Sequence, residues 1–492
     1  MLSKTKTQSL QAAIIHILAA AIGSLSTLFL YPKDLELYGI YGFLTNTASL
    51  LVPFVSLGFG NVMLRFFPYY KDPGNHHKGF FGFILTAYGM GILIFSFMFC
   101  FFYKFILDSF HSDNKLAEVY FLILPFTILL VCYEFASQLC INFQKINWTA
   151  WTALLLKIFL PLLFILSIKN FIAYKSFITL IFLYYAVVVC WIMIRISKKE
   201  SFLVQFSKDL YQQTERNKLL QYAGFSLLSG TSAVLALRLD SFFVGSMMGA
   251  EATGLFTLAM FMSNVVFIPA TAITDALNPS IAHYSKENDQ TALLKYYQSG
   301  SIHMMMATFF LVIMLMISFD TLSNIMPNAA KINAIKTAVY FLLFSRAIDA
   351  ATGTNHHILS YSKYYKYELY LLIGMAILNI SLNYYLIPKW GITGAAFATF
   401  VSVGLYNLCK TLLVYFLLNM HPFTIQSLKV LGIASVTFVI FNGAFELENP
   451  YMSLFLQMIT SGFSFLLLTF IFKCSPDLNK FVAEKFIKRF DD

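Results

Sequence analysis

The chain is a succession of long apolar stretches, each near twenty residues, separated by short polar connections. Because the hydrocarbon core of a bilayer is ~30 Å thick, a helix needs roughly 20 apolar residues to cross it. Backbone N–H and C=O groups in lipid must bond within their own segment, which favours helices over open strands. The pattern predicts an all-α polytopic membrane protein with about fourteen transmembrane helices, near residues 9–31, 41–62, 79–103, 117–140, 149–168, 174–194, 219–248, 253–276, 301–325, 334–357, 366–387, 391–418, 428–446 and 451–472.

Composition supports the membrane interpretation. Of the 492 residues, 58% are hydrophobic and 12% are charged, whereas a soluble domain carries about 25% charge. The net charge of +10 does not indicate nucleic-acid binding, because the basic residues gather in every second connection and no basic face is interleaved with aromatics. This placement is typical of topology signals and of attraction to anionic lipids. The six cysteines are scattered, with no CxxC pair, so they predict neither disulfides nor a metal site.

The placement of Lys and Arg predicts the orientation. With the N-terminus in the cytoplasm, the cytoplasmic segments hold 23 of these residues, Lys410 being counted among them, and the opposite face holds 8. Cytoplasmic loops carry an excess of basic residues in membrane proteins. We therefore expect an even number of spans and both termini in the cytoplasm.

Two halves of the chain echo each other. The first contains Gly39-Ile40-Tyr41, Pro53 and Tyr69-Tyr70-Lys71-Asp72; the second contains Gly254-Leu255-Phe256, Pro269 and Tyr284-Ser285-Lys286-Glu287, at a separation near 215 residues. Repeats of six spans share one orientation and are related by an axis along the membrane normal. The longest polar connection, 195–218, lies between them. We predict a six-helix lobe in 1–200, a second in 201–420, and two additional helices with a cytoplasmic tail in 421–492.

Besides the cations assigned to the two faces, three remain inside predicted spans: Lys157, Arg238 and Arg346. A charge at the bilayer centre is costly, so such residues usually face a polar cavity. Arg346 and Asp349 are three apart and can pair along one helix face. One interpretation is that these groups are satisfied pairs or snorkelling side chains. The interpretation we favour is a cationic cavity, which suits phosphate oxygens. Arg65 either lines its cytoplasmic mouth or anchors the topology.

Other polar positions leave alternatives open. Asn379 and Asn383, four apart, form an amide stripe that either bonds between helices or lines a sugar path. Prolines inside predicted spans allow bends, as a rocking transporter requires; they are Pro53, Pro125, Pro161 and Pro269. Motifs for nucleotide hydrolysis, metalloprotease or triad chemistry are absent from the sequence, so we expect no enzyme and no cofactor.

Two segments resemble a known family. Residues 378–396 read LNISLNYYLIPKWGITGAA and resemble the eleventh-to-twelfth helix signature of polysaccharide-transport (oligosaccharide flippase) proteins, in the multidrug/oligosaccharidyl-lipid/polysaccharide exporter superfamily. Residues 238–245 read RLDSFFVG, followed by Gly254-Leu255-Phe256, and are similar to that family's seventh-to-eighth helix pattern. With the layout of the spans, the resemblance covers essentially the whole chain.

The resemblance implies a flippase of the bacterial inner membrane. Such a protein moves undecaprenyl-pyrophosphate-linked oligosaccharide units to the periplasmic leaflet by alternating access, for O-antigen, capsule or exopolysaccharide. It implies two six-helix lobes around a central cationic cavity, and assigning Lys157, Arg238 and Arg346 to that cavity is a hypothesis. The expected partners are the lipid-linked oligosaccharide and membrane lipids, with a polysaccharide polymerase and a chain-length regulator as further candidates, and no nucleic acid.

The driving ion is left open between a proton and sodium, and the candidate carriers are Glu134, Asp240, Asp275 and Asp349. Alternatives within the superfamily are a peptidoglycan-precursor flippase and a cation-coupled multidrug exporter. A cavity for cationic drugs requires acids, whereas unpaired cations stand out here. An alternative of another class is a membrane-embedded polysaccharide polymerase, which requires a long periplasmic loop. The longest connections on that face, 104–116 and 326–333, are short.

Overall fold

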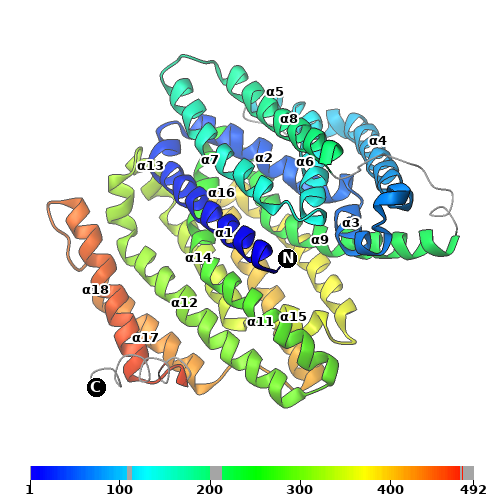
Figure 1. Cartoon of the computed structure of the whole chain (residues 1–492). Helices are drawn as coiled ribbons and strands as arrows, with labels where there is room; N and C mark the ends of the chain where they lie inside the picture. Colours follow the sequence, from blue (N-terminus) through cyan, green and yellow to red (C-terminus); the bar gives the residue numbers. More distant parts are fainter. Residues whose placement is uncertain (1, 108–113, 200–212, 477–478, 480–492) are drawn as a thin grey trace. The chain divides into compact units, whose positions relative to one another are not determined.

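A computed structural model describes residues 2–107, 114–199, 213–476 and 479, and the regular structure within these ranges is helical, without strands. Contacts divide the chain into two compact units, residues 1–257 and 258–492, and each is a bundle of helices (Figure 1). The helix at 213–248 packs along the helix at 35–55, in the first unit. Most of the predicted connection at 195–218, with the predicted boundary at 200/201, lies outside the described residues. The three-part division at 200 and 420 stays a prediction.

In the first unit, the helices at 123–142 and 213–248 both pack on the helix at 35–55. A π-helical turn at Ser26–Leu30 follows the first helix. The helices are α1 (Leu2–Leu25), α2 (Leu35–Val55), α3 (Phe59–Tyr70), α4 (Phe80–Leu107), α5 (Asn114–Tyr120), α6 (Ile123–Asn142), α7 (Ile146–Ile168), α8 (Tyr174–Lys199), α9 (Gln213–Met248) and α10 (Ala250–Val265), the last continuing into the second unit.

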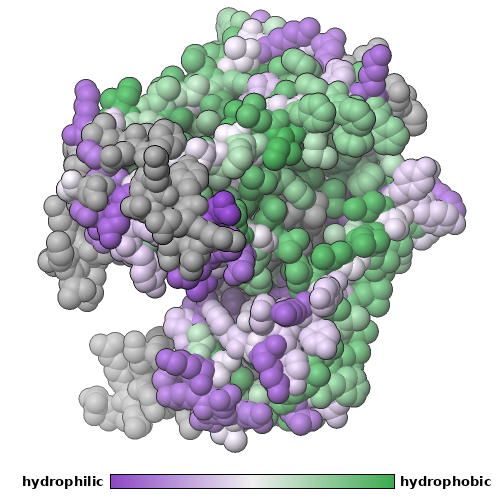
Figure 2. Space-filling model, turned by 90° about the vertical axis from the view of Figure 1, so that its right-hand side faces the viewer, coloured by the Kyte–Doolittle hydropathy of each residue, from purple (hydrophilic) through white to green (hydrophobic). Residues whose placement is uncertain are grey.

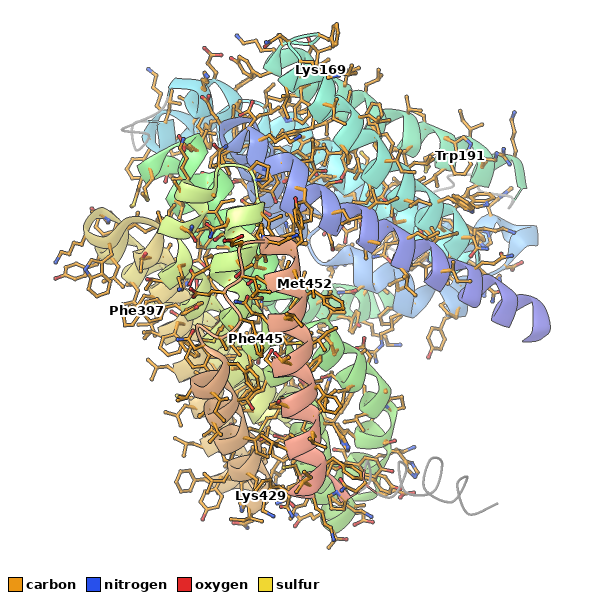
Figure 3. All side chains as sticks on the ribbon, turned by 90° about the vertical axis from the view of Figure 1, so that its left-hand side faces the viewer. Lys169, Trp191, Phe397, Lys429, Phe445 and Met452 are labelled. Atoms are coloured by element: carbon orange, nitrogen blue, oxygen red, sulfur yellow. The ribbon has the colours of Figure 1, made fainter. Side chains whose placement is uncertain are left out.

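The second unit has α12 (Gln290–Ile325) as its longest unbroken helix, and α17 and α18 pack on it and on each other. Figure 3 shows Lys429 at one end of this α17–α18 hairpin and Phe445 and Met452 at the other. The remaining helices are α11 (Ile268–Glu287), α13 (Ala329–Ala334), α14 (Lys336–Thr352), α15 (Asn355–Ser360), α16 (Tyr365–Leu418), α17 (Ile425–Phe441) and α18 (Pro450–Ile471).

Helices occur at every predicted span, but fewer than fourteen meet the length and composition of a membrane crossing. Within the described residues eight helices do, or up to ten if each of two bent helix pairs counts as one span. Two predicted spans fall short in length, because α14 and α17 have 17 residues each. The 54 residues of α16 include a break at Gly391, where φ is 56° and ψ is −135°. The all-α membrane class is therefore confirmed, whereas the count of fourteen is not.

The surface fits a lipid environment. Figure 2 shows hydrophobic residues over wide areas of the visible face, with hydrophilic residues gathered in patches. Along α4, Leu93, Phe97 and Phe101 are more than 70% exposed. Large exposed apolar areas are rare on soluble monomers, where they mark interaction or membrane surfaces. Lipid in contact with such side chains removes them from water.

The two echoing segments have the same local shape. The α2–α3 pair is bent by 50° and the α10–α11 pair by 48°, each at a short break. Pro53 lies near the end of α2, and Pro269 lies in the first turn of α11. A proline within a helical run removes a backbone donor and crowds the preceding turn, which favours a bend. The bends predicted from these two prolines are therefore present.

The glycines of the two echoing motifs meet in the first unit. A β-carbon at Gly39 would lie 2.8 Å from the Gly254 nitrogen and would overlap the Ala250 carbonyl oxygen. A β-carbon at Gly254 would lie 3.2 Å from the Gly39 nitrogen and would overlap the Leu35 carbonyl oxygen. Small residues allow helix backbones to approach closely where no hydrophobic force drives association in lipid. Here α2 and α10 touch backbone to backbone.

Candidate functional site

Arg238 lies on α9 where this helix packs along α2. Its Nη1 donates to Oδ1 of Asn46 at 3.1 Å, and Nδ2 of Asn46 donates to the Ser241 hydroxyl at 3.3 Å. The amide orients the guanidinium without neutralising it. No acidic partner of Arg238 occurs among the residues that the structure describes. Asp240 is fully buried two positions further along α9. Arg238 therefore remains a candidate for holding an anion.

Lys157 lies on α7, with its aliphatic stem against α1. A β-carbon at Gly23 would lie 3.3 Å from Lys157 Cδ and 3.6 Å from Nζ. The glycine thus leaves room for the lysine stem to cross the helix. The side chain is exposed, and the described part of the chain offers it no acid. A long basic side chain with an apolar stem and a free ammonium is suited to reach a polar group at a distance.

Arg65 lies on α3 and stacks on aromatic rings. Its guanidinium carbon is 4.5 Å from the centre of the Tyr222 ring and 5.8 Å from that of Phe66. Arg65 is exposed, and cation–π contacts of this kind contribute about 0.5–1 kcal/mol at exposed sites. Arg65, Lys157 and Arg238 all belong to the first unit. The two roles expected for Arg65, cavity mouth and topology anchor, both stay predictions.

Arg346 differs from these three cations. On α14 its Nη1 lies 3.9 Å from Oδ2 of Asp349, the pair predicted from their spacing. Its Nη2 donates to Oδ1 of Asn264, and its guanidinium lies over the Phe267 ring, 5.3 Å from the centre. Only 12% of the side chain is exposed. The charge of Arg346 is therefore compensated in this structure, so its role in a cationic cavity stays a prediction that this pairing weakens.

The Arg346–Asp349 pair continues into a polar network between α14 and α16. Asn407 donates from Nδ2 to Oδ1 of Asp349 at 3.2 Å, and the Thr352 hydroxyl donates to Oδ1 of Asn407 at 3.1 Å. Asn407 is fully buried. A buried amide costs free energy unless its donor and acceptor are both bonded. Here both are, so the network fixes α16 against α14.

Lys410 is a functional candidate that the sequence analysis missed. It was counted among the cytoplasmic cations, but it lies inside α16 and is 3% exposed, which corrects that assignment. Its ammonium lies 4.2 Å from the centre of the Tyr406 ring and interacts electrostatically with Asp349 and Glu368. Its position within the predicted span 391–418 was the available signal. Its acidic partners come from other helical segments, and the spacing of residues within one span does not reveal such contacts.

Glu368 is the second acidic residue that interacts with Lys410. It is 5% exposed on the first turn of α16 and accepts a hydrogen bond from the Ser360 hydroxyl on α15. Its other carboxylate oxygen contacts Nδ1 of His356, also on α15. His356 thus supports a buried carboxylate. Within the described residues no group of three or more His, Cys, Asp and Glu side chains is arranged to hold a metal ion.

The predicted amide stripe is enclosed. Asn379 and Asn383 are 1% and 0% exposed, and Nδ2 of Asn383 donates to the carbonyl oxygen of Asn379 at 2.9 Å and to its Oδ1 at 3.0 Å. Neither amide is exposed to a cargo in this conformation. Both bonds lie within α16, so the two alternatives, bonding between helices and lining of a sugar path, stay predictions.

The four candidate ion carriers have different surroundings. Asp275 is exposed on α11 and Asp240 is fully buried on α9. Asp349 already pairs with Arg346. Glu134, on α6, has a buried carboxylate oxygen without a hydrogen-bond partner. The structure thus brings Asp349 together with cations and leaves Glu134 apart from them.

Comparison with protein families assigns the chain. The profile described as polysaccharide biosynthesis protein matches residues 34–285, just over half of the sequence, from the start of α2 into the last turn of α11. The chain belongs to this polysaccharide biosynthesis protein family. The resemblance drawn from residues 238–245 falls inside the matched region. A comparison with curated protein sequences finds no match.

Solved structures share the fold of this family member. The structure of the lipid II flippase MurJ in an inward closed conformation matches with a TM-score of 0.71 and 14% identity, over 96% of this chain and 99% of MurJ. An inward-facing multidrug resistance transporter of the MATE family, in the MOP superfamily, matches with a TM-score of 0.65 and 13% identity, over 82% and 94%. An outward-facing MATE transporter gives a TM-score of 0.54 and 13% identity, over 84% and 94%. At these identities the likeness establishes the fold alone.

Proposed function

We propose that this family member is a flippase for lipid-linked oligosaccharides. It would move undecaprenyl-pyrophosphate-linked repeat units across the inner membrane by alternating access, and so supply the synthesis of a surface polysaccharide such as O-antigen, capsule or exopolysaccharide. The observation that carries the proposal is the match to the polysaccharide biosynthesis family over residues 34–285, in a chain of membrane-length helices. The chemistry is translocation, and no bond of the cargo needs to break.

The cations of the first unit suit the head group of this cargo. Arg238 and Lys157 have no acid partner among the described residues, and Arg238 is held in place by a neutral amide. Arginine and lysine are the usual partners of phosphate oxygens, arginine through two parallel hydrogen bonds. The electrostatic attraction between pyrophosphate and these groups would be far stronger at low dielectric than in water. Arg65 could receive the head group on the cytoplasmic side.

A second cargo has a specific observation in its favour. The fold match covers 99% of MurJ, whose name describes a lipid II flippase, and a peptidoglycan precursor would carry the same anionic link between lipid and sugar. A multidrug exporter shares the fold as well. The unpaired cations argue against cationic drugs, which an acid-lined cavity would hold. A polymerase finds no support in the family match.

Deleting the gene and following surface glycan and lipid-linked intermediates together tests the proposal. We expect loss of surface glycan, with complete repeat units accumulating on the cytoplasmic leaflet. Normal surface glycan with arrest of peptidoglycan synthesis would assign the precursor cargo instead. Repeat units that reach the periplasm without being joined would identify a polymerase.

Substitutions test the two cations. Arg238→Ala and Lys157→Ala should each lower glycan export at least about tenfold, because a charged hydrogen bond is worth roughly 1.5–3 kcal/mol. Lys389→Ala is the matched control, since Lys389 precedes the Gly391 break of α16 and its ammonium rests 3.7 Å from the centre of the Tyr385 ring. Full export by both variants at normal protein levels would remove these residues from the site.

A further inference from the structure

A carboxylate lies beside the break between α2 and α3. At this break Leu57 and Gly58 have φ angles of 51° and 73°, and Gly60 follows in the first turn of α3. A β-carbon at Gly60 would lie 2.5 Å from Oε1 of Glu134, on α6. The absence of a side chain at Gly60 is therefore what admits the Glu134 carboxylate. The Ser56 hydroxyl, at the end of α2, interacts with this carboxylate.

Among the residues that the structure describes, three buried oxygens on α4 and α6 lack a hydrogen-bond partner. They are Oε2 of Glu134, the hydroxyl of Tyr88 on α4, and Oε1 of Gln138, one turn further along α6. The Tyr88 hydroxyl is the close neighbour of the carboxylate, since the same β-carbon position at Gly60 lies 3.5 Å from it. Buried polar groups in native proteins are nearly always bonded, and a proton on the Glu134 carboxylate would allow it to donate a hydrogen bond to a neighbouring oxygen.

Apart from these polar groups, Glu134 has apolar neighbours. Val131 and Phe135 of α6 belong, with Phe59 of α3, to one buried hydrophobic cluster, and the Tyr88 and Phe135 rings are 5.4 Å apart. A carboxylate removed from water without a cation carries a large desolvation cost. Protonation removes the charge and turns one oxygen into a donor.

No cation faces Glu134 from the described parts of the helices that pack on α6. On α3, Arg65 stacks on Tyr222, and on α7, Lys157 lies against Gly23. The ionisable groups near the carboxylate are the Tyr88 phenol and, beside that phenol, the Cys132 thiol. On α8, Tyr185 contacts Tyr133 of α6.

The charged residues of the short helix α5 form ion pairs with residues outside this helix. Lys115 pairs with Glu36 at 2.6 Å, and Glu118 pairs with Lys175 at 3.1 Å. Hydrogen bonds from Tyr174 and Lys175 hold the pKa of the exposed Glu118 carboxyl below its usual range. Glu118 is thus ionised and paired, in contrast to Glu134.

We propose that Glu134 is the proton-binding site that couples transport to a proton gradient. In the conformation of this structure one proton from water is bound on Oε2 as a neutral carboxylic acid. When the α2–α3 break admits water, the proton returns to water and leaves a solvated carboxylate. This inference rests on the proposed function and selects one carrier among the four acids expected from the sequence.

The position of the site next to α9, the helix that carries Arg238, explains how proton binding would affect cargo binding. A β-carbon at Gly58 would lie 2.6 Å from the backbone nitrogen of Leu227 on α9, and Asn61 of α3 donates to the Ser226 hydroxyl at 2.8 Å. Arg238 follows eleven residues after Leu227, about 16 Å along the helix axis by helical rise. A change at the break therefore moves the helix that carries the candidate anion-binding arginine.

Infrared spectroscopy of the purified full chain in lipid vesicles tests proton binding without any cargo. We expect the carbonyl stretch of a protonated carboxylic acid near neutral pH, lost as the pH is raised. Glu134→Gln should lack this signal. Gly60→Ala should change its frequency or its titration, because the new methyl group displaces the flexible end of the glutamate and no backbone. Gly89→Ala, on α4, is the matched control, since nothing lies within 4 Å of its β-carbon.

Glycan export by the same variants tests coupling. At equal protein levels Glu134→Gln and Gly60→Ala should lower export at least about tenfold, in the range of typical coupling free energies, and Gly89→Ala should retain it. A carboxylic acid signal that persists in Glu134→Gln, or a signal that responds to sodium and not to pH, would overturn the proposal. So would full export by Glu134→Gln. An unchanged glycan after gene deletion would defeat the proposed function alone, because the infrared signal reports the proton site independently.

Discussion

At the scale of single residues, the cations placed inside the helices have different partners in the two units. In the second unit Arg346 and Lys410 are enclosed with Asp349 and Glu368, so two positive and two negative charges compensate each other. In the first unit Arg238 is bonded to a neutral amide. Buried pairs are sensitive to the loss of one member, whereas an unpaired cation is available for an anionic ligand. The compensated set therefore supports structure, and Arg238 is the better candidate for cargo binding.

Lys410→Met tests this distinction at the residue scale. Methionine keeps most of the apolar stem but leaves Asp349 and Glu368 without their shared cation. Removing one partner of a buried pair destabilises by about 3–5 kcal/mol, so we expect a lower midpoint of thermal unfolding in a fixed detergent. Lys429→Met is the control, because Lys429 is exposed and donates a hydrogen bond to the neutral Phe472 carbonyl oxygen. Equal stability of the two variants would contradict the buried network.

At the scale of helices, the echo between residues 39–72 and 254–287 corresponds to a shared shape. Both segments form bent pairs, at 50° and 48°, and the first glycines of both motifs, Gly39 and Gly254, touch. Periodicity and prolines predicted the helices and the bends. The contact between α2 and α10 could not be predicted, because it joins residues more than 200 positions apart.

Gly39→Ala tests the contact between the two motifs. The added methyl group overlaps the backbone oxygen of Ala250, which cannot rotate away as a side chain can, so the helices must separate. Overpacking typically costs about 1–3 kcal/mol, and we expect thermal unfolding at a lower temperature. Gly432→Ala, on α17, meets no atom within 4 Å and should be neutral. A Gly39→Ala variant as stable as wild type would show that α2 and α10 are not in close contact.

At the scale of the whole molecule, the α7–α8 hairpin displays two different ends. Figure 3 shows Lys169 at one end and Trp191 towards the other. Near Trp191, the Arg195 guanidinium lies 5.3 Å from the tryptophan ring centre, and the Trp148 ring is 5.6 Å away. Tryptophans gather at membrane–water interfaces, and basic residues mark the cytoplasmic side. The proposed topology therefore places the Trp191 end of this hairpin at the cytoplasmic interface.

Labelling of single cysteines tests this topology. In a background with the six native cysteines replaced, a membrane-impermeant maleimide applied to spheroplasts should modify cysteine at position 169 or 331 and spare cysteine at position 363. All three native lysines are exposed, so accessibility differs only by the side of the membrane. Labelling at 363 from outside, with none at 169 and 331, would reverse the orientation.

The sequence by itself determined the class of protein, the approximate helices, the two bends and the Arg346–Asp349 pair. Each of these follows from composition or from positions within one helix, where residues three or four apart share a face. Tertiary structure alone decided which cations are compensated. Asn46 and Arg238 are separated by 192 residues, Lys410 meets acids on other helical segments, and Gly60 of α3 makes the space for Glu134 of α6. Helical periodicity carries no information about which face of one helix meets which face of another, and in this protein those contacts decide which charges are compensated.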